Sequence, residues 1–406
     1  MKFPVFMDAQ STTPTDPRVV EAMLPYFTQK FGHPASRNHS FGWEAETAVD
    51  QARGQLAKII GARDPKEIVF TSGGTESINL ALKGAVEMYR EKGNHIVTTA
   101  IEQRAGLDVC KRLERQGFEV TYVPVGVDGL VDVEAVRGAL TDKTILVSVM
   151  FANNEIGTIQ DIAALGKLAK EKGVIFHTDA TQAMGKIPVD VEAMGIDLLS
   201  CTSHLVYGPK GVGALYVRRK GPRVRIAPLI DGGGHERGMR SGTLPVPLVV
   251  GFGTAAEICG QVMGEESARL RKMRDRLQDA ILSSVDEAFL NGHPERRLPH
   301  NLNISFAYVE GESVLMGLNK ETALSSGSAC TSSTLEPSYV IAALGASAEL
   351  AHSSIRFSLH RFNTDEEVEY VAQRTIEVVK RLREMSPLYE LAKEGVDLKS
   401  IKWKAE

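Results

Sequence analysis

Short apolar runs rich in β-branched residues alternate with helical patterns between about residues 45 and 260. Seven of these runs indicate strands, and most are apolar throughout: Glu67–Phe70, His95–Val97, Val120–Val123, Ile145–Val149, Val174–His177, Asp197–Ser200 and Ala214–Val217. A strand that is apolar on both faces fits a largely parallel sheet covered by helices on both sides. Between the first two strands, Ile78, Leu82, Ala85 and Tyr89 form one stripe at helical spacing. The alternation predicts a layered α/β domain.

The pattern changes after residue 260. Ser267–Leu282 and Asp365–Met385 have the charge and apolar spacing of long amphipathic helices, and Asn301–Phe306 between them indicates a strand. We therefore expect a large α/β domain over residues 15–260 and a smaller α+β domain formed by residues 1–14 and 261–406. Tyr389–Glu406 mixes charged and apolar residues, and we expect it to be a docking tail.

Composition narrows the classes of function. The chain has 47 basic and 51 acidic side chains and a net charge of −4, which argues against a nucleic-acid or membrane-surface protein. No apolar run approaches the roughly 18 residues of a membrane span, and Met1–Asp8 has the features of neither a signal nor a transit peptide. The cysteines lie far apart without a CxxC pair, at positions Cys110, Cys201, Cys259 and Cys330. We therefore expect no metal site, no disulfide framework, and a reducing cytoplasm as the location.

The segment Thr71–Ser77, with the sequence TSGGTES, follows a predicted strand and opens a predicted helix. Exposed N–H groups at a helix N-terminus suit a phosphate, and glycines let a ligand approach the backbone. A Gly-Gly turn with a Thr or Ser cap is also an ordinary connection from a strand to a helix. The segment alone is a weak indication of a phosphate site.

A second motif, His177–Gln182, stands at the end of a predicted strand and contains Asp179. An aspartate at the carboxyl end of a strand faces the ligand crevice of an open α/β sheet. Its carboxylate could pair with the protonated ring nitrogen of a bound cofactor. It could equally cap the following helix, and the motif in isolation favours neither role.

A third motif, Leu324–Ser332, places Cys330 among small, polar, turn-forming residues. Structural cysteines are usually buried among apolar neighbours, whereas reactive ones are partly exposed. The segment is therefore compatible with a loop that presents Cys330 as a nucleophile, and a structural role stays open.

Taken in order, these segments resemble the cysteine desulfurases of iron–sulfur cluster assembly. These are homodimeric members of the class V aminotransferase family that use pyridoxal phosphate (PLP) to take sulfur from cysteine. The match runs from Asp8 to Trp403 and includes NNEIG at 153–157, GGGHERGMRSGT at 232–243 and AHSSIRF at 351–357. The cysteine segment followed by LEPSY at 335–339 is similar to the branch that serves the scaffold protein.

The resemblance implies a PLP-dependent transferase fold of the aspartate-aminotransferase type. It also implies an obligate homodimer, L-cysteine as substrate, and an iron–sulfur scaffold protein or another protein as the sulfur acceptor. Neither nucleic acid nor a membrane is expected as a partner. The dimer would form two active sites, each completed by a residue from the other subunit.

Roles follow from the resemblance where residues match. Asp179 would face the pyridine nitrogen, Gln182 would face the ring hydroxyl, and Cys330 would take the sulfur as a persulfide. The PLP phosphate would be held by Gly74, Thr75, Thr202 and His204, with Thr243 reaching over from the other subunit. The substrate carboxylate would be held by Asn154 and Arg356, with Arg37 nearby, and Asn154 would serve the cofactor as well.

The departures from the family pattern cluster around the cofactor. Leu205 stands where the family has the lysine that forms a Schiff base with PLP, and leucine has no amine. Gln103 replaces the histidine that stacks on the ring and helps to move protons, and glutamine cannot titrate. Ser203 replaces the usual glycine, and residues 8–14 are altered where small residues line the mouth of the site. Because Leu205 has no amine, we expect any bound PLP to be noncovalent. Because one positioned acid–base group is typically worth about 10²- to 10⁴-fold in rate, we also expect impaired turnover.

Three functions remain open at this stage. The chain could be a desulfurase by descent with impaired turnover, or a catalytically inactive homologue that docks the scaffold or relays persulfide on Cys330. It could also carry out altered PLP chemistry with a noncovalent cofactor and an external amine. Lys210 lies close to Leu205 in the sequence, but it matches a family lysine other than the Schiff-base residue.

Overall fold

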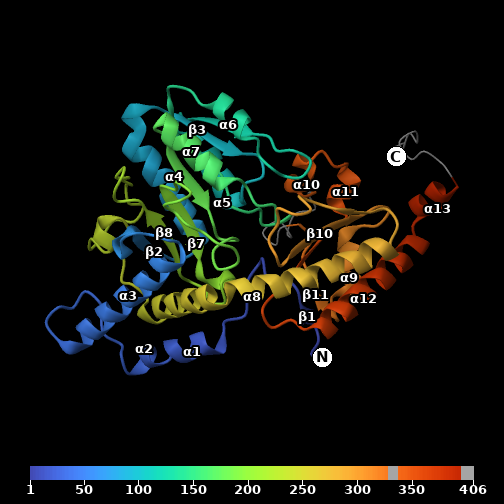
Figure 1. Ribbon diagram of the computed structural model, residues 1–406, viewed down its shortest axis with the longest axis horizontal. Coiled ribbons are helices and arrows are strands. Elements are labelled where there is room, and N and C mark those ends of the chain that lie inside the picture. Colours follow the sequence, from blue (N-terminus) through green and yellow to red (C-terminus); the bar gives the residue numbers. More distant parts are fainter. Residues whose placement is uncertain (328–336, 395–406) are drawn as a thin grey trace.

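The computed structural model describes residues 1–327 and 337–394 (Figure 1). Its largest layer is a seven-stranded sheet in the order β2-β8-β7-β6-β5-β3-β4. In chain order the strands are β2 (Ile68–Thr71), β3 (His95–Thr99), β4 (Glu119–Val123), β5 (Thr144–Ser148), β6 (Ile175–Asp179), β7 (Leu198–Thr202) and β8 (Gly213–Val217). β8 is antiparallel to both neighbours, and every other pair is parallel. All seven predicted strands are confirmed, with ends shifted by at most two residues.

Helices cover both faces of this sheet (Figure 1). α4 (Gly74–Tyr89) and α5 (Arg104–Glu114) form a core with one face. α3 (Ser40–Ile59), α7 (Ile162–Lys172) and the first half of α8 (Val246–Ser284) form a core with the other. Because successive strand residues point to opposite faces, each central strand must be apolar at nearly every position.

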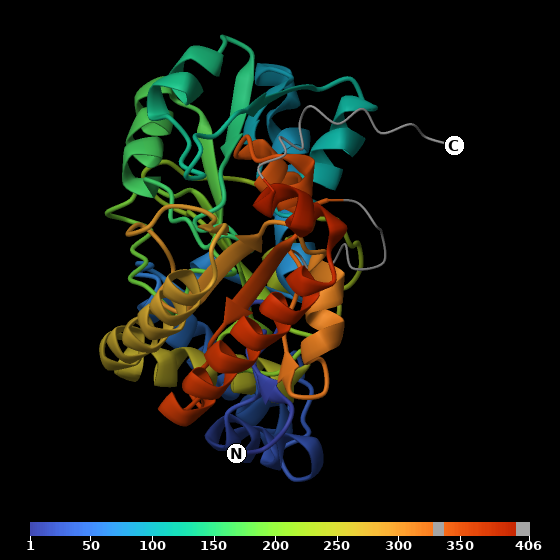
Figure 2. The same cartoon turned by 90° about the vertical axis from the view of Figure 1, so that its right-hand side faces the viewer.

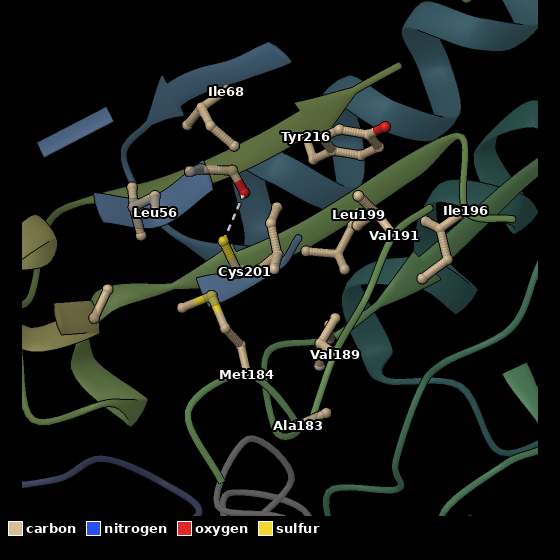
Figure 3. Packing of buried hydrophobic residues seen from close by; sticks show 14 of the residues in the cluster. Leu56, Ile68, Ala183, Met184, Val189, Val191, Ile196, Leu199, Cys201 and Tyr216 are labelled. Atoms are coloured by element: carbon tan, nitrogen blue, oxygen red, sulfur yellow. Dashed lines mark hydrogen bonds between the residues drawn. The ribbon is translucent and has the colours of Figure 1, made fainter. Parts of the chain in front are cut away.

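The packing beneath β7 and β8 illustrates this second core (Figure 3). Leu199 and Cys201 of β7 belong to the same buried cluster as Leu56 of α3 and Met184, and Cys201 lies beside Met184. The Cys201 thiol donates a hydrogen bond to the Ala214 carbonyl oxygen at 3.4 Å. Cys201 is therefore a structural cysteine inside the core, because its thiol is buried and already bonded.

A second group of elements surrounds an antiparallel three-stranded sheet in the order β12-β10-β9. Its strands are β9 (Ala288–Leu290), β10 (Asn301–Phe306) and β12 (Ser354–Ser358), and β10 is the strand predicted from the sequence. The N-terminal β1 (Val5–Phe6) pairs in parallel with β11 (Thr322–Ala323). α9 (Gly311–Leu318), α12 (Asp365–Glu384) and the second half of α8 supply the core of this group.

α8 is longer than the sequence predicted. The expected helix Ser267–Leu282 is only its second half, and the helix begins at Val246. Residues up to Cys259 pack with the large sheet, whereas those from Leu270 onward pack with the small sheet and beside α12 (Figures 1 and 2). The expected domain boundary at residue 260 therefore falls within a single continuous helix.

α8 is also the one described helix long and apolar enough to cross a membrane, with a mean hydropathy of 1.4 over 18 residues. The expectation that no segment approaches this length and hydropathy was wrong. Half of that window is buried inside the protein, and the core helix of a globular protein passes the same test. A β-carbon at Gly253 would stand 2.6 Å from Ala52 of α3, so the two helices pack closely along this stretch.

The remaining helices are short. They are α1 (Pro17–Met23), α2 (Pro25–Thr28), α6 (Val133–Ala139), α10 (Tyr339–Ala343), α11 (Ala348–His352) and α13 (Pro387–Lys393), with 3₁₀ turns η1 (Pro65–Glu67), η2 (Arg90–Lys92), η3 (Ser203–Leu205) and η4 (Glu236–Gly238). The predicted docking tail lies largely outside the described residues, because the description ends one residue after α13.

Candidate cofactor site

A cavity of about 220 Å³ opens at the carboxyl ends of the parallel strands. This is the edge at which open α/β sheets bind ligands. Nine predicted site residues line it: Gly74, Thr75, Gln103, Asn154, Gln182, Thr202, His204, Leu205 and Arg356. An adjoining hollow of about 400 Å³ shares Gly74, Thr75 and His204 with the cavity and extends to Lys210. Residues scattered over most of the chain thus meet at one site.

One end of the cavity suits a phosphate. The N-terminus of α4 lies there, and its N-cap, Gly73, provides no side-chain cap for the first N–H groups of the helix. A β-carbon at Gly74 would stand 2.9 Å from Thr181 Cγ2, so glycine keeps this approach open. Thr202 Oγ1 is buried without a hydrogen-bond partner among the described residues. Free helix N–H groups and an unpaired hydroxyl are what an anion requires.

His204 stands at the same end, half-buried, with its Nδ1 atom 3.3 Å from Thr12 Oγ1. Burial and the nearby Lys210 charge lower the pKa of His204 below its usual value. Burial and Lys210 thus favour the neutral imidazole in the ligand-free site, and the ring can contact a phosphate by hydrogen bonding.

Asp179 is the last residue of β6 and is buried beside the cavity residues Thr181 and Gln182. Its Oδ1 atom accepts a hydrogen bond from the Thr181 N–H at 2.9 Å, as in a helix cap. Its Oδ2 atom is buried and has no partner within the described chain. Burial raises the pKa of Asp179. A protonated ring nitrogen would supply both the missing donor and the opposite charge.

Arg356 and Asn154 form the end suited to a carboxylate. Arg356 is buried, and its Nη1 atom donates to the Asn154 carbonyl oxygen at 2.9 Å. Its Nη2 atom donates to Asp8 Oδ1 and to Ser11 Oγ, both at 2.7 Å. Arg356 Nε and Asn154 Oδ1 are left without partners among the described residues. The two predicted residues are brought together, but the guanidinium is already paired with Asp8.

Leu205 contributes an apolar wall. It ends the η3 turn directly after β7 and is only 6% exposed. Gln103, at the N-cap of α5, has its Oε1 atom buried in the same cavity without a partner in the described chain. No lysine is among the described residues that line this cavity. Ser203 is buried nearby but does not line it.

Six lining residues were not predicted: Gln10, Ser11, Ile78, Arg104, Thr181 and Tyr339. Gln10 and Ser11 belong to the altered segment 8–14, so the sequence carried a signal for them. The Arg104 guanidinium stacks on the Tyr339 ring, 4.6 Å from its centroid, and the Tyr339 hydroxyl donates to the Glu102 carbonyl oxygen at 2.6 Å. Nothing in the local sequence of either residue indicates this long-range pairing.

Three described residues among those predicted do not line the cavity of this chain: Asp179, which is buried beside it, and Arg37 and Thr243, which are exposed. Arg37 is exposed, and its carbonyl oxygen accepts a hydrogen bond from Trp43 Nε1 at 2.7 Å. Thr243 is exposed and lies 3.3 Å from His33 Nε2 through its Oγ1 atom. The role predicted for Thr243 concerns the opposite subunit, which a single chain does not display. Cys330 lies outside the described residues.

The residues present fit PLP. Residues suited to a phosphate and residues suited to a carboxylate both line the cavity, and Asp179 Oδ2, buried beside it, has no partner among the described residues. PLP with an amino acid has a phosphate, a protonatable ring nitrogen and a carboxylate, so each feature has a counterpart. Across residues 1–327 and 337–394, no group of three or more His, Cys, Asp or Glu side chains is placed to hold a metal ion.

Comparison with known proteins identifies a family whose members this chain resembles over nearly its whole length. The family described as "Aminotransferase class-V" matches residues 5–371. The chain is 56% identical over 400 residues to the cysteine desulfurase IscS of Rickettsia bellii, covering 98% of this chain and 97% of that protein. It is 56% identical over 405 residues to the cysteine desulfurase IscS of Photorhabdus laumondii, covering 99% of each. A solved structure titled "NIFS-LIKE PROTEIN" has a TM-score of 0.85 and 37% identity, covering 93% of this chain and 100% of that one.

These matches confirm the predicted PLP-dependent transferase fold with its mostly parallel central sheet. The chain belongs to the class V aminotransferase family, among the cysteine desulfurases.

Proposed function

We propose that this chain is a cysteine desulfurase-type protein that holds PLP without a covalent link. Sulfur from L-cysteine would pass through a Cys330 persulfide to an iron–sulfur scaffold or another acceptor protein, with turnover impaired by Leu205. One observation supports this most: the cavity keeps the contacts that PLP needs, yet Leu205 forms the wall where the resemblance expects the Schiff-base lysine.

Each retained residue has a role in this proposal. Gly74, Thr75, Thr202 and His204 would hold the phosphate. Asp179 would keep the ring nitrogen protonated, because a buried carboxylate stabilises a cation beside it. When bound, PLP supplies the electron sink for cleaving bonds of an amino-acid substrate. Arg356 and Asn154 would orient the substrate carboxylate, since a guanidinium matches the geometry of a carboxylate.

The proposed impairment lies in proton transfer and in cofactor retention. Leu205 can neither bond to the cofactor nor carry a proton, and Gln103 cannot titrate. His204 can titrate but would be engaged with the phosphate. With the lysine and the histidine of the family both absent, the cavity wall has no acid–base group at those two positions, and one such group is worth about 10²- to 10⁴-fold in rate.

The proposed assembly is a homodimer in the cytoplasm. Large apolar side chains are exposed along α1, α2, the following loop and the start of α3: Leu24, Phe27, Phe31, Phe41 and Trp43. Phe31 is 64% exposed and Trp43 is 55% exposed. The Phe31 and Phe41 rings are in contact, with centroids 5.3 Å apart. A group of exposed apolar side chains of this kind suits an interface, and the loop between α2 and α3 also carries Arg37. Sedimentation as a monomer at micromolar concentration would contradict the dimer.

The decisive experiment compares three proteins loaded with PLP: the wild type, Leu205→Lys and Leu205→Met. After borohydride reduction, peptide mapping should find pyridoxyl-lysine only in Leu205→Lys, because the methionine variant changes the side chain without adding an amine. Dialysis should remove PLP from the wild type and from Leu205→Met but not from Leu205→Lys. A pyridoxyl-lysine in the wild type would refute noncovalent binding.

The sulfur-transfer part is tested by adding L-cysteine and measuring persulfide on Cys330 by mass spectrometry. Leu205→Lys should form persulfide faster than the wild type, and adding Gln103→His should raise turnover further. If the double variant binds PLP covalently but never forms a Cys330 persulfide, the chain is not a desulfurase, and a binding or relay role takes precedence.

A further inference from the structure

A carboxylate lies at the phosphate end of the site. Glu76 stands in the first turn of α4 and lines the hollow of about 400 Å³ together with Gly74, Thr75 and His204. It is the one acidic side chain among the described residues that line this hollow or the adjoining cavity. An uncompensated carboxylate here would repel a phosphate, because like charges at close range disfavour each other.

Arg240 compensates that charge. Its Nε atom donates to Glu76 Oε1 at 2.8 Å and its Nη2 atom donates to Oε2 at 3.2 Å, so the pair is two-pronged. The two side chains are 15% and 14% exposed, so solvent screens the pair only in part. Burial alone would raise the pKa of Glu76, but the hydrogen bonds from Arg240 and Ser72 lower it below its usual value. The carboxyl group is therefore ionised near neutral pH and depends on Arg240 for its counter-charge.

The same pair fixes the direction of the Glu76 side chain. Glu76 Oε2 also accepts a hydrogen bond from the Ser72 N–H at 2.6 Å, so both carboxylate oxygens are engaged away from the start of the helix. An acidic side chain in a first turn otherwise favours the positive N-terminal end of its own helix. Arg240 thus leaves the N–H groups at Gly74 and Thr75 available to an anion.

The segment 232–243, which carries Arg240, is anchored at a second point. Glu236 accepts hydrogen bonds from Nη1 and Nη2 of Arg53, each at 2.7 Å, and this ion pair is buried. Glu236 and Arg237 have φ angles of 48° and 57°, a left-handed conformation that is costly for residues other than glycine. The buried pair therefore holds the segment in a shape that brings Arg240 to Glu76.

We propose that Arg240 is a positioning residue for the cofactor phosphate: by pairing with Glu76 it removes the repulsion of that carboxylate and keeps the start of α4 open to an anion. This rests on the proposed function in assuming that a phosphopyridoxyl group occupies the site. Arg240 lines neither the hollow nor the cavity, so it acts through Glu76 and not by touching the phosphate.

The test compares two ligands that differ only in the phosphate. Pyridoxine phosphate and pyridoxine share the same ring, and neither has an aldehyde that could react with lysine side chains. Calorimetry measures both ligands with the wild type, Arg240→Gln, Glu76→Gln and the double variant. Arg240→Gln should weaken the binding of pyridoxine phosphate about tenfold, because the Glu76 charge loses its compensation, and should leave pyridoxine unchanged.

The double variant separates charge compensation from a purely structural role. Adding Glu76→Gln to Arg240→Gln should restore the affinity for pyridoxine phosphate nearly to the wild-type value, because the repelling charge is gone. The amide oxygen can still accept from the Ser72 N–H. A pair that only stabilised the fold would give an equal or greater loss in the double variant, for both ligands, and that result would overturn the proposal.

The matched controls are Arg137→Gln, Glu134→Gln and their double variant. Glu134 also stands in the first turn of its helix and pairs with an arginine, but both side chains are exposed and far less buried than the Arg240 pair. These variants should leave both affinities unchanged. Melting curves establish which proteins are folded. If Arg240→Gln does not fold, Glu76→Gln alone decides: it should bind pyridoxine phosphate at least as tightly as the wild type, and weaker binding would overturn the proposal.

The failures of the two proposals are distinguishable. If the wild type binds pyridoxine phosphate no more tightly than inorganic phosphate, the proposed cofactor site is overturned, and the role of Arg240 with it. If the wild type binds pyridoxine phosphate more tightly than inorganic phosphate and Arg240→Gln binds it equally well, only the role of Arg240 is overturned.

Discussion

The Arg356 guanidinium and the Asp8 carboxylate form an ion pair, with Nη2 and Oδ1 2.7 Å apart, although 348 residues separate them in the chain. Arg356 has only 2% of its side chain exposed, and Asp8 has 16%. The residue expected to bind a substrate carboxylate is therefore held in place before any ligand arrives. The pair also ties the N-terminal segment to β12.

Replacing Asp8 with Asn should test how much this ion pair contributes to the stability of the fold. Because the change leaves Arg356 buried without its counter-ion, we expect the free energy of unfolding to fall by about 3 kcal/mol, the low end for a broken buried pair. The control is Glu134→Gln, which removes the exposed partner of Arg137 and should cost less than about 1 kcal/mol. Chemical denaturation measures both, and equal losses would contradict the structural role of Asp8.

Asp179→Asn should weaken the cofactor without weakening the fold. The amide keeps an oxygen to accept from the Thr181 N–H, but it cannot pair with a protonated ring nitrogen. We expect PLP to bind about 10- to 100-fold more weakly, as for a lost charged hydrogen bond. The ligand-free protein should be at least as stable, because an unpaired buried carboxylate is costly.

Asp190→Asn is the control for that variant. Asp190 also accepts hydrogen bonds from backbone N–H groups shortly after it, those of Glu192 and Ala193, but it is exposed. It should leave PLP affinity unchanged. Equal loss of affinity in the two variants, measured by fluorescence titration, would remove Asp179 from the cofactor site.

Glu102 should make the stability of the fold depend on pH. Burial raises the pKa of this carboxyl to about 8 from 4.5. Between these values the folded protein keeps a proton that the unfolded chain has lost, so the free energy of unfolding should fall as pH rises from about 4.5 to 8. The slope contributed by this group is at most about 1.4 kcal/mol per pH unit.

Glu102→Gln should flatten that dependence, because the amide retains an acceptor for Thr99 and for the Met150 N–H but does not titrate. Glu91→Gln, at an exposed position, should leave the slope as it is. Denaturation at several pH values measures both. A wild-type slope that is unchanged in Glu102→Gln would show that the carboxyl titrates normally.

The central sheet could be predicted because its strands are buried on both faces and therefore appear in the sequence as short apolar runs. The short strands gave no such signal: β1 and β11 have two residues each, and Phe289 in β9 is 42% exposed. The first half of α8 was missed for the opposite reason. Between Val246 and Gly260 it is apolar on most sides, since α3 and the sheet cover it, and so it lacks the amphipathic stripe that identifies a helix.

The site residues also fall into those with a local sequence pattern and those without one. Gly74 and Asp179 could be singled out because a glycine-rich helix start and a strand end leave local patterns, whereas Thr202 followed only from the family resemblance. Ser11 and Arg104 were not, because their roles depend on contacts across the chain: Ser11 bonds to Arg356, 345 residues away, and Arg104 stacks on Tyr339. That Arg356 is already paired with Asp8 could not be foreseen from either motif.

The last prediction concerns the relative reactivity of the cysteines. Cys110, Cys201 and Cys259 are all buried, and burial raises the pKa of each thiol, to about 12 for Cys110 and Cys201. Since the thiolate is the reactive form, these three should react slowly with an alkylating agent. The neighbours of Cys330 in the sequence are Ala329 and Thr331, which are small, so we expect an accessible thiol that is alkylated first.

Competitive alkylation of the native protein followed by mass spectrometry measures the four rates in one sample. Cys330→Ser should abolish the fast phase, whereas Cys110→Ser should leave it unchanged, which assigns the phase to one thiol. Accepting sulfur requires a nucleophile and an accessible path but no lysine, so a fast Cys330 would be compatible with persulfide relay even with Leu205 in place. Labelling of Cys330 no faster than that of the three buried thiols would contradict every function in which this cysteine handles sulfur.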